Sequence, residues 1–262
     1  MTTTANALVS RAVEDGVAIL TLNHPPANTL TPEVLAELKA ALDALATEAA
    51  IKVVVVTGTG RFFIAGADIR VLAAIPSSRE GTEMALRGQA IFNKIESFEK
   101  PVIAAINGAC LGGGLELAMC CHIRLAAEDA RLGQPEINLG IIPGFGGTQR
   151  LLRLIGRSKA TELILTGDLI SAKEAKALGL VSHVVSPEDL LRQAMGLARK
   201  IATKSRVAVR AALQAIDQGA ELELHEALAL EARLFGGLCD SEDRKEGTTA
   251  FLQKRQPQFK DR

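Results

Sequence analysis

The sequence predicts an α/β core over residues 1–200, followed by a helical region over residues 201–262. Three runs rich in β-branched residues have the character of buried strands, at residues 17–22, 52–57 and 101–106. A loop and a helical stretch follow each run, and strands that alternate with helices are typical of α/β domains. Near residue 186 the strand pattern stops, which indicates an all-helical end.

The first helix of the core is the most clearly predicted. Thr31 can cap its N-terminus and Pro32 suits its first position. A second helix is predicted at about residues 82–98, and short strands at 123–126 and 181–185 continue the alternation. The first helix has apolar residues at helical spacing on one face: Val34, Leu35, Leu38, Leu42 and Leu45.

The all-helical end of the chain begins within the core at Ser186, a hydroxyl cap that Pro187 and two acidic residues follow. Residues 222–235 are apolar around too wide an arc for a helix with one solvated face. A second surface must cover such a helix, which predicts a contact with another subunit. The predicted helices lie at about 187–203, 205–218, 221–235 and 241–254.

Composition excludes two classes of partner. The chain has 30 Lys+Arg and 30 Asp+Glu, a formal net charge of zero, whereas nucleic-acid-binding and membrane-surface proteins usually carry a basic excess. Trp and Tyr are absent, so platforms that stack bases or sugars are not expected. No apolar run reaches the roughly 18 residues of a membrane-spanning helix.

The cysteines predict neither a metal site nor a disulfide framework, because they form no CxxC pair. Scattered thiols fit a reducing compartment. Residues 1–6 lack the basic and apolar segments of a secretory signal. We therefore expect a cytoplasmic protein, or the mature form of an organellar matrix protein. The four cysteines are Cys110, Cys120, Cys121 and Cys239.

Two isolated carboxylates are the strongest chemical signal. Glu116 is the only charged residue in 101–121, and Glu136 is the only one in 132–149. An unpaired buried carboxylate costs several kcal/mol, so such groups are usually paired, shifted in pKa or functional. The alternative is structural: Glu116 in the first turn of a helix and Glu136 in an exposed loop.

Glycines surround both carboxylates, since nine of the 23 glycines fall within residues 108–147. Gly112, Gly113 and Gly114 precede a helix, whose free N–H groups would face a ligand. The segment 62–69 follows the strand at 52–57 and offers a second donor loop. Together they predict an oxyanion hole, unless the glycines serve only close packing.

Six motifs follow one another in a fixed order and spacing. They are FFIAGADI at 62–69, PVIAAINGACLGGGLELAM at 101–119, LGQPEINLGIIPGFGGTQR at 132–150, LTG at 165–167, AKALGLV at 175–181 and EGTTAFLQKRQPQF at 246–259. In these motifs the chain resembles the enoyl-CoA hydratase (crotonase) family along nearly its whole length. The resemblance implies a crotonase-like spiral of ββα repeats with a C-terminal helical trimerisation region, commonly a hexamer of two trimers.

The resemblance also implies an activity and the residues that carry it. Water would add reversibly to a trans-2-enoyl-CoA to give a 3-hydroxyacyl-CoA, as in β-oxidation of fatty acids, without a metal or redox cofactor. The backbone N–H groups of Ala67 and Gly113 would hold the thioester oxygen. Glu116 and Glu136 would be the acid–base pair, their two roles left unassigned, and Gly144 would help to place the water.

The resemblance further implies that the loop at 67–70 runs along the pantetheine and nucleotide of CoA. Two C-terminal residues match positions that reach the CoA or acyl end. The residues expected to bind CoA are Ala65, Ala67, Asp68, Ile69, Arg70, Gly113, Phe251 and Lys254.

Three alternatives stay open. A crotonase-family isomerase is the nearest, although related isomerases typically manage with one of the two carboxylates. An RNA-binding relative would need a lysine-rich helix, but residues 79–100 balance basic against acidic side chains. A noncatalytic acyl-CoA-binding subunit would not need both glutamates. One departure from the family is His122, where many members carry Asp; six residues beyond Glu116, it is not expected to touch substrate.

Overall fold

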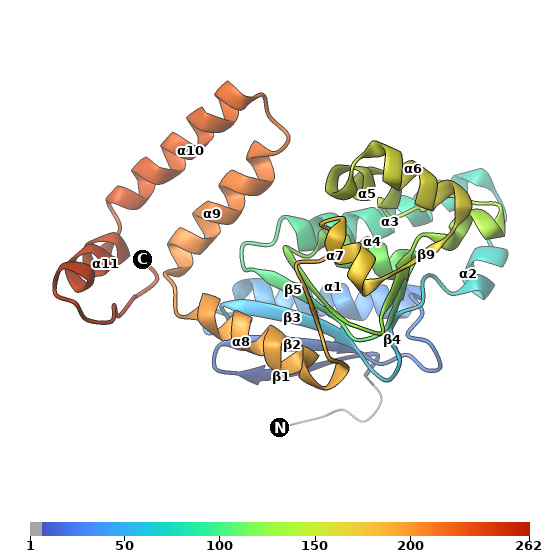
Figure 1. Cartoon of the computed structure of the whole chain (residues 1–262), viewed down its shortest axis with the longest axis horizontal. Helices are drawn as coiled ribbons and strands as arrows, with labels where there is room; N and C mark the ends of the chain where they lie inside the picture. The colour runs from blue at the N-terminus through green and yellow to red at the C-terminus, as the bar shows by residue number, and fades with distance from the viewer. Residues whose placement is uncertain (1–6) are drawn as a thin grey trace.

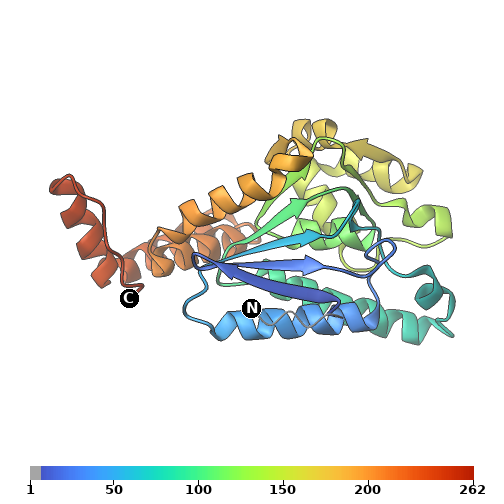
Figure 2. The ribbon, with the colours of Figure 1, turned by 90° about the horizontal axis from the view of Figure 1, so that it is seen from below.

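The computed structural model describes residues 7–262 and folds them into two sheets, surrounding helices and a projecting helical end (Figures 1 and 2). The larger sheet has the order β1-β2-β3-β5-β7-β10. Only β1 runs antiparallel to its neighbour; the other pairs are parallel. Its strands are β1 (Val9–Glu14), β2 (Val17–Leu22), β3 (Val53–Gly58), β5 (Val102–Ile106), β7 (Ile123–Ala127) and β10 (His183–Val185).

The smaller sheet has the order β4-β6-β8-β9, with β9 antiparallel to β8. The pairs β3/β4, β5/β6 and β7/β8 each place one strand in each sheet before the chain enters a helix, which confirms the predicted spiral of ββα repeats. The strands are β4 (Phe62–Ile64), β6 (Ala109–Leu111), β8 (Arg131–Gly133) and β9 (Leu169–Ser171).

The predicted strands of the larger sheet are confirmed, β2 at the predicted bounds and the others with ends that differ by at most two residues. All residues of β5 are buried, as are all of β3 except Gly58. Full burial explains their continuous apolar sequence, which is typical of parallel strands covered on both faces. Neither β1 nor any strand of the smaller sheet was predicted from the sequence pattern.

The first two long helices pack beside the sheets. In α1 (Pro32–Thr47) the Thr31 hydroxyl accepts the Val34 N–H at 3.3 Å, so the predicted cap is confirmed. The helix α3 (Ser78–Glu96) begins four residues before the predicted start, because Ser77 caps it through the Glu80 N–H. A short helix that was not predicted, α2 (Ile69–Ala73), precedes it.

Five short helices follow strands of the two sheets. Two of them carry the candidate carboxylates, and only α4 had been predicted. They are α4 (Gly113–Cys120), the 3₁₀ helix η1 (Pro135–Leu139), α5 (Gly147–Ile155), α6 (Arg157–Thr166) and α7 (Ala172–Ala177).

The predicted helix at 187–203 is a 3₁₀ turn, η2 (Pro187–Asp189), continued by α8 (Leu190–Ala202). One face of α8 is buried against the larger sheet. Three more helices form the C-terminal arm, defined here as residues 206–252: α9 (Arg206–Gly219), α10 (Leu224–Cys239) and α11 (Glu242–Leu252). Figures 1 and 2 show α10 and α11 standing away from the sheets.

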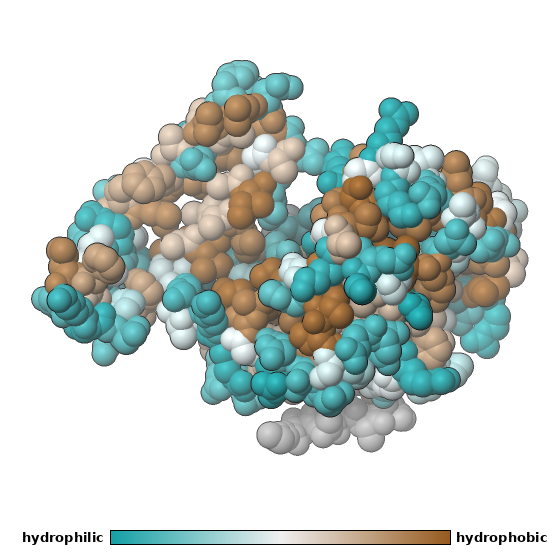
Figure 3. All heavy atoms as spheres, viewed as in Figure 1, coloured by the Kyte–Doolittle hydropathy of each residue, from teal (hydrophilic) through white to brown (hydrophobic). Residues whose placement is uncertain are grey.

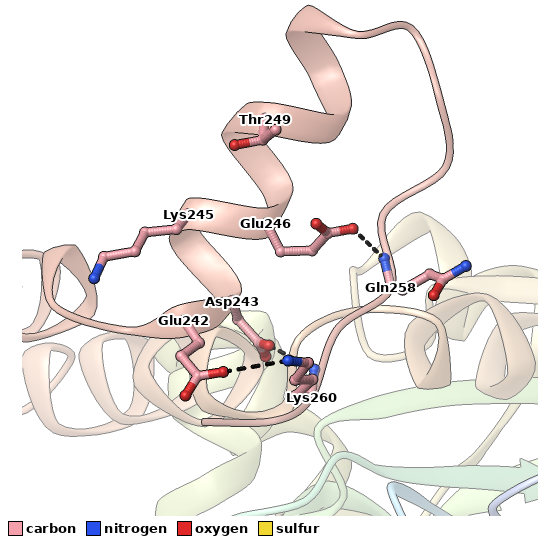
Figure 4. A pocket seen from close by; sticks show the side chains of 7 residues that line it. All are labelled: Glu242, Asp243, Lys245, Glu246, Thr249, Gln258 and Lys260. Carbon is pink, nitrogen blue, oxygen red and sulfur yellow. Dashed lines mark hydrogen bonds and ion pairs between the residues drawn. The ribbon is translucent and has the colours of Figure 1, made fainter.

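The chain end returns from the arm to the core. Asp243 is buried and accepts the backbone N–H groups of Lys260 and Asp261. Glu246 accepts the Gln258 N–H at 2.7 Å (Figure 4). Asp261 in turn pairs with Lys52, at the start of β3, at 2.9 Å. Through the chain end, these contacts tie the first turns of α11 to the larger sheet.

The arm exposes apolar side chains, which appear brown in Figure 3. Phe235 is 69% exposed and Leu224 is 73% exposed. The predicted wide apolar arc is therefore uncovered in a single chain. Residues 1–6, which the sequence analysis used for localisation, lie outside the described residues.

Candidate active site

Glu116 lies at the start of α4, directly after β6. The chain enters the helix at Gly112, whose φ of 51° favours glycine. An ideal Cβ at Gly114 would lie 2.2 Å from the Ile64 carbonyl oxygen. The glycines therefore let α4 pack directly on β4, and Glu116 within this helix is only 2% exposed.

The buried Glu116 carboxylate accepts two backbone hydrogen bonds. Its Oε1 atom accepts the N–H groups of Phe145 at 2.8 Å and Gly147 at 2.7 Å. Burial raises the pKa of Glu116 to about 7, the neighbouring Glu136 adds to the rise, and the two N–H groups and Arg150 oppose it. Near neutral pH this carboxyl can therefore either hold or release a proton.

Glu136 lies on η1 and lines the same pocket as Glu116. Its side chain is partly buried, and burial raises its pKa as well. An Oε1 atom of Glu136 stands 2.7 Å from the position that a Cβ on Gly112 would take, so glycine makes room for this carboxylate. Two carboxyls with raised pKa values in one pocket can exchange protons with a bound molecule as a pair.

The pocket has a volume of about 220 Å³ and an apolar wall around its two carboxylates. Most of the wall comes from α2, α3 and the loop at 141–145. It is lined by Ala67, Leu72, Ile75, Gly81, Met84, Ala85, Gly113, Glu116, Glu136, Ile141, Ile142, Gly144 and Phe145.

The backbone N–H groups of Ala67 and Gly113, which both line this pocket, have no hydrogen-bond acceptor within residues 7–262. The bridge between Leu30 and Ala67 uses the neighbouring N–H of Asp68 and leaves that of Ala67 free. Gly113 is the first residue of α4, where N–H groups have no partner within the helix. An ideal Cβ at Gly113 would lie 3.7 Å from the Ala67 nitrogen, so the two groups are neighbours.

Gly144, expected to help place water, also lines the pocket. Its carbonyl oxygen accepts the Gln89 side-chain amide at 2.9 Å, which fixes the loop against α3. Behind it, the Phe145 ring packs edge-on against Phe92 with centroids 5.4 Å apart. Gly88 has no Cβ to meet that ring, since an ideal one would lie 2.4 Å from it.

The remaining residues expected to bind CoA do not line the pocket. The Ala65 N–H donates a hydrogen bond to the Ala27 carbonyl oxygen, which fixes the backbone at this turn. The Ile69 side chain is exposed. Asp68 caps α2 and accepts the guanidinium of Arg70 at 2.8 Å, which lowers the pKa of Asp68 to about 2. Arg70 also lines a neighbouring groove of about 460 Å³.

Phe251 and Lys254 lie far from the pocket of their own chain. Phe251 is on α11 and 83% exposed, and Lys254 follows that helix with φ of 54°. Figures 1 and 2 place α11 and α2 at opposite ends of the molecule. One chain therefore does not bring these two residues to the carboxylates.

His122 lies at the end of α4, away from the pocket lining. Its Nδ1 accepts the Val102 N–H at 2.9 Å, and its buried Nε2 has no hydrogen-bond partner among the described residues. The nearest acid is Asp217 of α9, whose carboxylate is 3.7 Å away. Burial lowers the pKa of His122, and its nearest polar neighbours belong to β5 and α9 rather than to the pocket.

Sequence reasoning missed Gln134, which is fully buried beside Glu136. It also missed the apolar wall. The only available signal for Gln134 was a lone amide two residues before an isolated carboxylate. The wall residues come from helices far apart in sequence, so no local pattern marks them.

No group of acidic, histidine and cysteine side chains within residues 7–262 has the arrangement of a metal site. In the same range, no helix is both long and apolar enough to cross a bilayer.

Comparisons with known proteins agree over nearly the full length. Residues 12–262 match the family described as enoyl-CoA hydratase/isomerase. A probable enoyl-CoA hydratase of Bacillus subtilis is 51% identical, with 96% of this chain and 98% of the relative covered. A crotonyl-CoA hydratase of Syntrophomonas wolfei is 46% identical, with 94% and 95% covered.

The fold agrees as well. The crystal structure of an enoyl-CoA hydratase from Bacillus anthracis has a TM-score of 0.94 and 42% identity, with 98% of this chain and 100% of that chain covered. The spiral of ββα repeats, the matched residues 12–262 and these relatives lead to one conclusion: the chain belongs to the enoyl-CoA hydratase/isomerase family.

Proposed function

We propose that the chain hydrates trans-2-enoyl-CoA thioesters to 3-hydroxyacyl-CoA, with Glu116 and Glu136 as the acid–base pair. The observation that carries the proposal is their shared pocket, which also presents the unpaired N–H groups of Ala67 and Gly113. Relatives described as enoyl-CoA and crotonyl-CoA hydratases support the same reaction.

The two N–H groups would act on the thioester carbonyl. When water adds at C3 of the enoyl group, negative charge develops on this oxygen. Preorganised donors stabilise that charge, and losing one such donor costs about 2.7–4 kcal/mol in other enzymes. Ala67 and Gly113 have the required free N–H groups side by side.

The two carboxyls would divide the proton transfers. One ionised glutamate takes a proton from water as the hydroxyl group bonds to C3, and the other, protonated, delivers a proton to C2. The pKa of Glu116, raised to about 7, keeps both of its protonation states accessible near neutral pH, and burial raises the pKa of Glu136 as well. The pair ends the cycle with its proton moved from one carboxyl to the other, and exchange with water resets it.

The groove beside the pocket supports a route for CoA. It shares Ile75 and Met84 with the pocket and carries Arg70 and Arg87. These guanidinium groups can meet phosphates, which they bind well. We therefore place the acyl group in the pocket and the phosphates of CoA along this groove.

The arm supports an oligomer, which we propose to be a trimer or a hexamer of two trimers. Its exposed apolar residues need a partner surface. Phe251 is on α11 and Lys254 follows this helix, which Figure 1 shows at the opposite end of the molecule from α2, so a role for them in CoA binding requires a neighbouring subunit.

We further propose that the chain works in fatty-acid β-oxidation, in the cytoplasm or an organelle matrix. Its four cysteines are all free, which fits a reducing compartment. The hydratase relatives support the class of substrate.

The direct test is to mix the protein with crotonyl-CoA and follow loss of the conjugated enoyl-thioester absorbance. Hydration lowers this absorbance, and the product should co-elute with 3-hydroxybutyryl-CoA. A 3-enoyl-CoA in a parallel reaction tests the isomerase alternative, because isomerisation creates the same absorbance. Activity on the 3-enoyl ester alone would overturn the proposal.

A further inference from the structure

The buried side-chain amide of Gln134 lies between Gly112, next to the oxyanion hole, and the carboxyl group of Glu136. Its side chain is 0% exposed and follows β8 at the entry to η1. One end of the amide faces Gly112 and the other faces Glu136. In the proposed hydration, Gln134 neither transfers a proton nor binds the thioester oxygen.

The contact with Gly112 links Gln134 to the oxyanion hole, because the Gly112 carbonyl and the Gly113 N–H belong to one peptide group. Gln134 Nε2 lies 3.3 Å from the Gly112 carbonyl oxygen, which also accepts the Glu116 N–H at 2.9 Å. The same peptide group carries the free N–H of Gly113. A donor on the carbonyl polarises the peptide, so the N–H becomes a stronger donor.

The contact with Glu136 depends on a proton. The amide atom nearest Glu136 lies 3.2 Å from both carboxylate oxygens. If this atom is the Gln134 oxygen, it accepts a hydrogen bond only from a protonated Glu136. If the amide is turned over, its nitrogen donates to both oxygens of an ionised Glu136.

The surroundings allow these two orientations. An ideal Cβ at Gly147 would lie 2.7 Å from Gln134 Oε1, so glycine provides the space that this end of the amide occupies. Turning the amide over exchanges two groups of nearly equal size and leaves the packing unchanged.

We infer that Gln134 is a positioning residue that couples the proton on Glu136 to the donor strength of the Gly113 N–H. This inference rests on the proposed function. When Glu136 holds the proton, its O–H donates to Gln134 and the amide nitrogen donates to Gly112. When Glu136 is ionised, the amide turns toward it and Gly112 loses that donor. The oxyanion hole is therefore strongest while Glu136 is protonated.

The test compares Gln134→Met, Gln134→Glu and the exposed control Gln149→Met. Methionine keeps the length of the side chain and removes both hydrogen bonds. We expect kcat for crotonyl-CoA to fall about 10-fold with little change in KM, less than the roughly 10²–10³-fold loss when an oxyanion donor is removed. Gln149→Met should match the wild type.

A spectroscopic measurement separates positioning from packing. A donor-substituted cinnamoyl-CoA absorbs at longer wavelength when its carbonyl oxygen is polarised. Bound to the wild type, this ester should show a red-shifted band, and Gln134→Met should reduce the shift. Gln134→Glu should lose activity as pH rises, because its own carboxylate then faces that of Glu136, and should recover activity at lower pH.

The decisive comparison is between the wild type and Glu136→Gln, which has no carboxyl to titrate at this position. The red shift of the bound ester should shrink as the pH rises in the wild type and should stay constant with pH in Glu136→Gln. A wild-type shift that does not change with pH, or an unchanged band in Gln134→Met, would overturn the inference. If the methionine variant does not fold, the pH profile of Gln134→Glu decides. A wild type that binds the ester but does not hydrate crotonyl-CoA would instead refute the proposed function.

Discussion

The glycine-dense centre, residues 108–147, and the C-terminal arm, residues 206–252, differ in how closely the chain packs around their glycines. In the centre, ideal Cβ atoms on Gly108 and Gly114 would meet carbonyl oxygens at 2.1 and 2.2 Å. In the arm, Gly236 and Gly237 have nothing within 4 Å. At these glycines the backbone of the centre packs directly against other backbone of the same chain, whereas the arm presents exposed apolar residues that another surface can cover.

This difference indicates that the centre serves catalysis and that the arm serves association between subunits. The centre buries a carboxyl and keeps two backbone donors free, which requires fixed backbone positions. The arm exposes Phe235 and Leu224 and makes few contacts with the sheets. Changes in the centre should therefore alter catalysis or folding of the chain, and changes in the arm should alter association.

The largest expected effect follows from neutralising either carboxyl. Glu116→Gln and Glu136→Gln should each lower kcat by about 10²–10⁴-fold, because a proton donor or acceptor is lost while the shape is kept. Steady-state kinetics with crotonyl-CoA measures the loss. Calorimetric titration with a nonreactive acyl-CoA should show that binding survives. Near-wild-type turnover in either variant would remove that residue from the mechanism.

A methyl group at Gly114 should damage the fold of the centre. Because an ideal Cβ there lies 2.2 Å from the Ile64 carbonyl oxygen, α4 and β4 must separate. We expect Gly114→Ala to lower the free energy of unfolding by about 3 kcal/mol in urea titrations. The matched change in the arm, Gly237→Ala, should instead stabilise the chain by up to about 1 kcal/mol. Equal effects at the two positions would contradict the comparison.

The buried Glu116 should make stability depend on pH. Its pKa is raised in the folded state to about 7 from an ordinary 4.5, so folding favours the protonated form. This contribution is complete below pH 4.5 and is lost as the pH rises toward 7, on the order of 3 kcal/mol in total. Urea titrations from pH 5 to 8 should show Glu116→Gln gaining stability relative to the wild type. Parallel pH profiles of the two proteins would count against a raised pKa.

The smallest effect on the chain itself is expected from a charge on the arm. Phe235→Asp should change the unfolding free energy of one chain by about 0.5 kcal/mol or less, because Phe235 is 69% exposed. It should nevertheless lower the oligomer mass in sedimentation, because the charge would be buried in the subunit contact. The control Leu191→Asp, on α8, should leave the mass unchanged. Identical masses for both variants would argue against the arm as the contact.

The fold was predictable where local signals are strong. The Thr31 cap and the buried leucines of α1 form one amphipathic helix, and the valines of β3 form one buried strand. The strands β4, β6, β8 and β9 were missed because each is three residues long. Such strands are too short for a periodic pattern, and pairing with partners distant in sequence stabilises them.

The site was predictable in part for a similar reason. Glu116 and Glu136 are conspicuous as single charges in apolar sequence, and the structure brings both into one pocket. Gln134 carries no charge and gains its position only from the folded contact with Gly112 and Glu136. Phe251 lies in a matched motif, but one chain does not place it at the pocket.

The central claim is that Glu116 and Glu136 work as one acid–base unit. The most direct measurement is kcat for crotonyl-CoA in Glu116→Gln, Glu136→Gln and the double variant, with folding verified for each. Residues that act as a unit are strongly non-additive, so the double variant should be about as slow as the slower single variant. Independent roles would make the two losses multiply, and that result would contradict the account.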